Sequence, residues 1–262
     1  HGVEFNPYTY FHPAAIERRI NNDVPLIDET DFPLNQYYTN TIKNLCDSVN
    51  GESRWLNALF IYANPNQILQ IQSLPFVKNI QALQSQAKAA QQNYVPLLEG
   101  AERLLKTQTQ FMQADVFAQK SLTGKGIRIA VFDAGFPNVD KGFAFEHIRK
   151  RNGIIACYDF VRNKENVYLS SDHGTMTLSC IAGKNGADNI GLAIDADFLL
   201  ARTERSLFEP IGEEENWLMA AEWADKNGAH IINSSLGYTA HRYFQKNMDG
   251  KFTLVSRAAN MA

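Results

Sequence analysis

The feature that most constrains the fold is a regular alternation of short apolar segments and helical segments after residue 122. The apolar segments that read as strands are Ile127–Phe132, Ile154–Phe160, Phe198–Ala201 and His230–Ser234. Helical patterns follow His173 and extend across Glu213–Asn227. This alternation favours a mostly parallel sheet with helices on both faces. The sequence therefore predicts an α/β, doubly wound fold for residues 123–262.

The helix predicted at Glu213–Asn227 is the best specified of these elements. Acidic residues in its first turn complement the helix dipole, and Gly228 stands where a C-terminal cap requires positive φ. Its apolar face consists of Trp217, Ala220, Ala221 and Ala224. We expect this face to pack on the sheet.

The first third of the chain has a different pattern. Trp55–Tyr62 reads as a strand, Asn64-Pro65 opens a helix, and Pro75–Ile80 reads as a returning strand. A stretch rich in Gln, Ala and Lys then follows, which suits a connector. We predict a small α+β domain over residues 1–85, a connector over 86–122 and a second domain over 123–262.

Composition excludes some functions and leaves others open. A net charge of −3 and a pI near 6.1 give no basic surface for nucleic acid. No apolar run reaches the ~18 residues of a membrane span. Cys46, Cys157 and Cys180 are scattered, so they indicate neither a disulfide framework nor a zinc site. We expect Cys180 to be a small core residue on the apolar side of its helix.

Two residues at the ends of predicted elements could act together in catalysis. Asp133 closes an apolar strand, and His173 begins a helix in the run Asp172-His173-Gly174-Thr175. Either residue alone is consistent with a capping role. Together they provide an imidazole base with a carboxylate that orients it, which is the pairing required to activate a nucleophile.

A third segment, His230–Gly237, is an apolar strand that ends in Ser234-Ser235-Leu236-Gly237. Small residues at a strand edge leave backbone groups to which an extended peptide can add as a further strand. Neither serine lies in a Gly-x-Ser-x-Gly elbow, so neither is predicted to be a nucleophile.

These motifs, in this order, resemble those of the subtilisin-like serine proteases. VFDAGF resembles the family's Asp motif, DHGT its His motif, and INSSLG its substrate-binding strand. The resemblance implies that Asp133 is the orienting acid and His173 the general base. It also implies that Ser235, Leu236 and Gly237 pair with a peptide or protein substrate. The expected activity is that of a serine endopeptidase with an Asp-His-Ser triad.

The first 85 residues resemble the second half of a subtilisin propeptide, a ferredoxin-like unit that inhibits the site intramolecularly. The wording NPYTYFHPAAIERR resembles exported subtilases of Bacteroidetes-type bacteria. This resemblance implies a secreted or periplasmic zymogen whose signal peptide has been removed. No serine follows His173 in a Gly-Thr-Ser context, so the chain reads as truncated before its nucleophile. A separate chain could carry the missing half.

Metal binding has little support in the sequence. The segment 184–190, which forms part of a calcium site in some subtilases, contains Asp188 as its one carboxylate. Calcium prefers six to eight oxygen ligands, so no cofactor is predicted. A non-catalytic protein that uses a protease-like fold to bind a peptide or partner remains the alternative.

Overall fold

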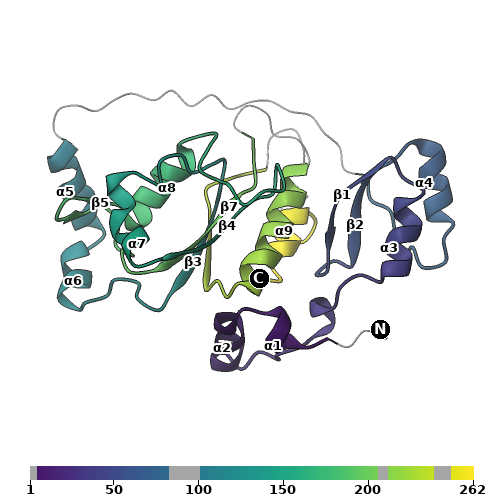
Figure 1. Cartoon of the computed structure of the whole chain (residues 1–262), viewed down its shortest axis with the longest axis horizontal. Coiled ribbons are helices and arrows are strands. Elements are labelled where there is room, and N and C mark those ends of the chain that lie inside the picture. Colours follow the sequence, from purple (N-terminus) through teal and green to yellow (C-terminus); the bar gives the residue numbers. More distant parts are fainter. Residues whose placement is uncertain (1–4, 83–100, 206–211, 239–248) are drawn as a thin grey trace. The chain divides into compact units, whose positions relative to one another are not determined.

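The computed structural model describes residues 5–82, 101–205, 212–238 and 249–262 (Figure 1). The chain divides into two compact units. The first unit combines residues 1–87 with 210–228 and 238–262, and the second contains residues 88–209 and 229–237. Among the described residues, no helix is both long and apolar enough to cross a membrane.

The second unit is built on a fully parallel sheet. Its strands lie in the order β4, β7, β3, β8, where β3 is Arg128–Asp133, β4 Ile154–Asp159, β7 Asp197–Arg202 and β8 Ile231–Ser234. The remaining elements are α5 Ala101–Phe111, α6 Ala114–Gln119, η2 Phe143–Phe145, α7 Glu146–Lys150, α8 His173–Ala182, and the small pair β5 Lys184–Asn185 and β6 Asp188–Asn189. The predicted mixed α/β fold with a parallel sheet is confirmed.

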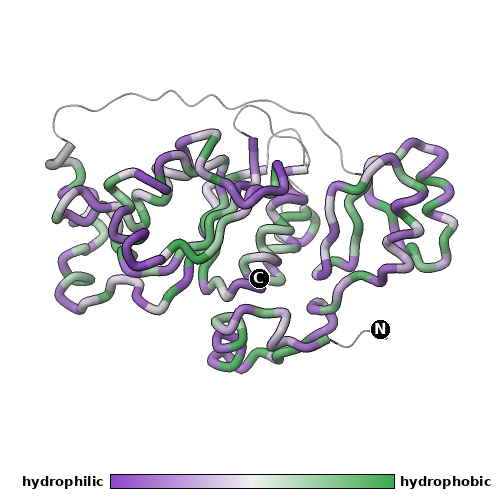
Figure 2. Tube along the Cα trace, viewed as in Figure 1, coloured by the Kyte–Doolittle hydropathy of each residue, from purple (hydrophilic) through white to green (hydrophobic). Residues whose placement is uncertain are grey.

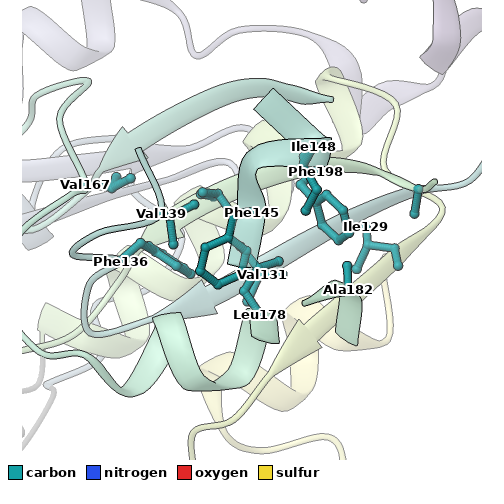
Figure 3. Close-up of a cluster of buried hydrophobic side chains, with 12 residues drawn as sticks. Ile129, Val131, Phe136, Val139, Phe145, Ile148, Val167, Leu178, Ala182 and Phe198 are labelled. Atoms are coloured by element: carbon teal, nitrogen blue, oxygen red, sulfur yellow. The ribbon is translucent and has the colours of Figure 1, made fainter. Parts of the chain in front are cut away.

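An apolar cluster joins this sheet to the helices beside it. Every residue of β3 is buried. The strands of this sheet are among the most apolar parts of the trace (Figure 2). Figure 3 shows side chains of β3 and β7 packed with those of α7 and α8. The labelled members are Ile129, Val131, Phe136, Val139, Phe145, Ile148, Val167, Leu178, Ala182 and Phe198. This cluster fixes α8 beside β3.

The first unit is a small α+β assembly. Its elements are α1 Pro7–Tyr10, α2 Pro13–Asn21, η1 Glu29–Asp31, α3 Gln36–Lys43, β1 Ser48–Ser53, β2 Ala58–Tyr62, α4 Pro65–Gln72, α9 Gly212–Lys226 and α10 Leu254–Ala259. Strands β1 and β2 pair antiparallel. The expected helix start at Asn64 is confirmed, because its side chain accepts hydrogen bonds from the backbone N–H groups of Asn66 and Gln67.

The predicted pairing of Trp55–Tyr62 with Pro75–Ile80 is wrong. The partner of β2 is β1, a polar strand with Gly51 in it that lacks a strand-like pattern. The segment 75–80 forms no strand. Its Phe76 ring instead stacks on Tyr38 of α3, with 4.1 Å between the ring centroids. Aromatic packing, rather than a ladder of hydrogen bonds, therefore places this segment.

Helix α9 packs within the first unit, against β1. A Cβ added to Gly51 would lie 2.4 Å from the sulfur of Met219 on α9, so the strand and helix approach closely there. Gly228 ends the helix with φ of 76°, which confirms the predicted cap. A Cβ on Gly228 would lie 2.7 Å from the backbone nitrogen of Ala15 in α2.

This double constraint on Gly228 can be tested by Gly228→Ala. Alanine would adopt a strained positive φ and would also press against the backbone of α2, so we expect a loss of about 2 kcal/mol or more in unfolding free energy. Gly186→Ala is the matched control, because Gly186 has φ of 60° but no atom within 4 Å of an added Cβ. Thermal or denaturant unfolding measures both. Equal losses in the two variants would contradict the close packing of α2 on Gly228.

Candidate functional site

The candidate site begins at the carboxyl end of β3. Asp133 is the last residue of this strand, and it pairs in register with Arg202, the last residue of β7. Because all strands of the sheet are parallel, their carboxyl ends meet at one edge, where open α/β sheets place their sites. The Asp133 side chain has no exposed surface.

Helix α8 brings His173 to this edge. The Nδ1 atom of His173 lies 2.8 Å from Oδ1 of Asp133, and the imidazole keeps 27% of its surface exposed. The structure therefore brings together the two side chains that the sequence singled out. One ring nitrogen faces the buried carboxylate while part of the ring reaches solvent, which is the arrangement that a general base needs.

Two glycines allow this close approach. A Cβ on Gly174, the second residue of α8, would lie 2.4 Å from the backbone oxygen of Gly135 and 2.8 Å from Cβ of Asp133. Gly135 has φ of 147°, and a Cβ there would lie 2.0 Å from the backbone oxygen of Leu169. Both of these oxygens are backbone atoms that cannot rotate away. Gly174 therefore lets the start of α8 approach the end of β3, and Gly135 makes room for the segment that leads into α8.

Backbone and side-chain donors hold the Asp133 carboxylate. The Ala134 N–H donates to Oδ1 at 2.7 Å, and the Thr177 hydroxyl donates to Oδ2 at 3.2 Å. Burial raises the pKa of Asp133, and hydrogen bonds from His173, Ala134 and Thr177 act against that rise. The carboxylate is thus costly to bury but well provided with partners.

A buried ion pair supports the turn after Asp133, and sequence reasoning did not identify it. Nη1 of Arg202 lies 2.9 Å from Oδ2 of Asp159, and Nε of Arg202 donates to the Ala134 backbone oxygen at 3.0 Å. The Thr203 N–H also donates to the Asp133 backbone oxygen at 3.0 Å. A charged residue at the end of each of two predicted strands was the signal that could have revealed this pair.

The third predicted segment continues from β8, the strand at the edge of the sheet. Ser234 lies opposite Phe132 of β3, so Ser235 follows at the level where β3 ends in Asp133. Ser235 and Gly237 are exposed, and Leu236 is half-buried. Among the described residues, no hydrogen bond connects 235–237 with Asp133 or His173. Their role in binding substrate stays a prediction.

The other site expectations have mixed outcomes. Cys180 is exposed on α8, so its prediction as a core residue is wrong; Leu178 and Ala182 form the buried face of that helix. Asp188 lies exposed in the β5–β6 pair. In the part of the chain that the structure describes, no group of three or more His, Cys, Asp or Glu residues is arranged to hold a metal ion.

A second charged cluster lies in the first unit. Arg19 and Arg54 both bind Asp31, which is fully buried. Nη1 of Arg19 lies 2.7 Å from Oδ2 of Asp31, and Nη1 of Arg54 lies 2.8 Å from Oδ1. Both arginines also reach Asp225 of α9, at 3.3 Å and 2.9 Å. Glu222 of α9 accepts hydrogen bonds from the backbone N–H groups that follow β1. Buried charges thus join the N-terminal segment to α9.

The two kinds of acid in this cluster respond to pH in opposite directions. Burial tends to raise the pKa of Asp31, but hydrogen bonds and charge from the arginines leave it below its usual value. Asp31 therefore stabilises the unit above the ordinary carboxyl range and ceases to do so as pH falls. Burial raises the pKa of Glu222. Its contribution is present at low pH and is lost as pH rises through that raised pKa.

The importance of the contact between α8 and β3 can be tested by Gly174→Ala. The new methyl group would push the start of α8 away from Gly135, so we expect a loss of about 1–3 kcal/mol in stability and a longer His173–Asp133 distance. A crystal structure and thermal unfolding measure these effects. Ser179→Ala, on the exposed side of the same helix, is the control. An unchanged His173–Asp133 distance in Gly174→Ala would contradict the argument.

Comparison with known proteins gives two family matches. Residues 3–95 match the model of the peptidase S8 propeptide domain of Bacteroidota. Residues 124–261 match the model of the subtilase family.

Individual relatives are similar to about half of this chain. Alkaline elastase YaB of Bacillus sp. (strain YaB) is 29% identical over 130 residues, which cover 49% of this chain and 31% of that protein. Subtilisin Savinase of Lederbergia lenta is 27% identical over 127 residues, 48% of this chain and 43% of that protein. The chain thus spans less than half the length of these relatives. Among solved structures, MycP1 from Mycobacterium smegmatis has 24% identity and a TM-score of 0.41, covering 58% of this chain and 40% of that one.

Proposed function

Because the chain belongs to the subtilase family of serine proteases, we propose that it forms part of the precursor of a secreted serine endopeptidase. The observation that carries this proposal is the 2.8 Å contact between His173 and the buried Asp133. In such an enzyme the imidazole takes the proton of a serine hydroxyl as that hydroxyl attacks a peptide carbonyl. Asp133 holds the imidazole in the required tautomer and stabilises its charged form.

We assign the remaining parts of the site by the same logic. We assign the role of nucleophile to none of the serines in residues 1–262, because none of them stands in a Gly-Thr-Ser context. A peptide substrate extends along Ser235, Leu236 and Gly237. These residues follow β8, the edge strand of the sheet, where backbone groups can pair with an extended peptide.

We propose residues 1–85 as the intramolecular propeptide, 86–122 as the connector, and 123–262 as the first half of the catalytic domain. The match of residues 3–95 to a propeptide model supports the first assignment. Residues 86–100 of the connector lie outside the described residues. Helix α9 falls in the stretch matched by the subtilase model, yet it packs with β1 in the first unit. We therefore assign α9 as the catalytic-domain helix that holds the propeptide.

The triad assignment is tested by two substitutions in the full-length gene product. His173→Ala removes the general base and should abolish hydrolysis of a denatured protein substrate. Asp133→Asn should lower turnover about 10⁴-fold, because it favours the wrong imidazole tautomer. Both variants should retain a cooperative thermal transition. Hydrolysis by His173→Ala at the wild-type rate would show that this histidine is not the general base and would refute the triad assignment. Absence of hydrolysis by the wild-type protein would instead favour a non-catalytic binding protein.

The propeptide assignment is tested by Arg54→Met in the inactive His173→Ala background. Removing this guanidinium leaves the buried Asp31 and the half-buried Asp225 with one partner fewer, which should weaken the hold of the N-terminal segment on α9 by about 3 kcal/mol. Limited proteolysis by added trypsin should then cleave residues 5–82 much faster than before. Lys43→Met, at an exposed basic residue of α3, is the control. Equal proteolysis of the two variants would contradict the role of this ion cluster.

A further inference from the structure

The two oxygens of the Asp133 carboxylate are held in different ways. Oδ1 is hydrogen-bonded both to Nδ1 of His173 and to the Ala134 N–H. Oδ2 accepts from the Thr177 hydroxyl at 3.2 Å. Since Asp133 is fully buried, solvent does not satisfy this oxygen directly. A buried carboxylate oxygen without a donor would be costly, so the Thr177 contact has an energetic consequence.

The position of Thr177 on α8 explains how its hydroxyl reaches the site. Thr177 follows His173 by four residues, about one helical turn, so both side chains lie on the same face of α8. A threonine within a helix often bonds back to the carbonyl four residues earlier. Here the hydroxyl donates instead to Asp133 across the helix–strand contact. Its β-branched side chain has few rotamers, which favours one hydroxyl position.

Other hydroxyls of α8 do not contact Asp133. Thr175 donates to the Pro137 backbone oxygen at 2.7 Å, and Ser179 donates to the Met176 backbone oxygen at 2.7 Å. These bonds support the helix and the loop beside it without reaching the carboxylate. The contact with Asp133 is therefore a particular property of position 177, and α8 offers a matched threonine for comparison.

We propose that Thr177 is a positioning residue that fixes the rotation of the Asp133 carboxylate and helps to keep it ionised for its partner His173. This proposal rests on the proposed serine-protease function. With Oδ2 tied to α8, rotation of the carboxylate about its Cβ–Cγ bond is restricted, so Oδ1 stays directed at the imidazole. Thr177 touches neither the substrate nor the reacting serine in this role.

The consequence for chemistry is a shift in pH dependence. Burial already raises the pKa of Asp133, and the Thr177 hydrogen bond is one of the contacts that lower it. Without that donor, Asp133 binds a proton more tightly. A protonated Asp133 no longer stabilises an imidazolium ion. The acid-side limb of the activity profile should therefore move to higher pH.

The test compares Thr177→Val and Thr177→Ser in the full-length protein by the pH profile of kcat/KM on a peptide substrate. Valine keeps the shape of threonine but removes the hydroxyl. We expect Thr177→Val to lower kcat/KM several-fold at acidic pH. The acid-side limb of the pH profile should move to higher pH by about half a pH unit. Thr177→Ser, which retains the hydroxyl, should restore most of the wild-type profile. A wild-type limb in Thr177→Val, or a failure of serine to restore it, would overturn the proposal.

Thr175→Val is the control for general damage to α8. It loses a hydroxyl hydrogen bond to the Pro137 backbone oxygen, so its thermal stability should fall, but the acid-side limb should stay in place. An equal shift of the limb in Thr175→Val would also overturn the proposal, because the effect would then belong to the helix as a whole.

A second measurement separates this proposal from the proposed function. The carboxyl carbon of Asp133 gives a ¹³C NMR resonance that reports protonation of this side chain, and its pH dependence can be followed without substrate. Thr177→Val should move this titration of Asp133 to higher pH, whether or not the protein hydrolyses peptides. Inactive wild-type protein with an altered Thr177→Val titration would refute only the protease function. An unaltered titration would refute only the role of Thr177.

Discussion

The burial of one carboxylate at the end of β3 sets the requirements for everything around it. A charged group without solvent is tolerated only when hydrogen bonds replace its lost hydration. Asp133 obtains these bonds from the next backbone N–H, from the first residue of α8 and from Thr177 one turn later. Helix α8 must therefore begin against the strand end, which explains the glycines at 135 and 174.

Other contacts within the second unit hold Asp133 and α8 in place. Arg202 and Asp159, which end β7 and β4, form a buried ion pair that also holds the Ala134 carbonyl. The apolar cluster between the sheet and α8 keeps the helix in register with the strand. The site is therefore carried by regular elements, which hold catalytic groups with greater precision than loops.

The first unit treats buried charge in a different manner. Asp31 is bound by two arginines, so formal charges balance its charge, and the Asp28 N–H adds one backbone hydrogen bond. Such a network is strongly directional but depends on every member, because loss of one partner leaves the others buried without compensation. Asp133, by contrast, accepts hydrogen bonds from two neutral donors, the Ala134 N–H and the Thr177 hydroxyl.

The sequence by itself determined the elements with strong local signals. The buried β strands, the start of α4 at Asn64 and the end of α9 at Gly228 follow from apolar runs, a capping residue and a glycine with positive φ. The pairing of Asp133 with His173 was also predicted, because one residue ends a strand, the other begins a helix, and an imidazole base needs a carboxylate that orients it. Only the tertiary structure decided that polar β1, rather than Pro75–Ile80, pairs with β2, and that Thr177 rather than Thr175 reaches the carboxylate. Local sequence identifies elements with strong signals, but it missed β1 and wrongly predicted a strand at Pro75–Ile80. Those choices depend on contacts between residues distant in the chain, which no local pattern encodes.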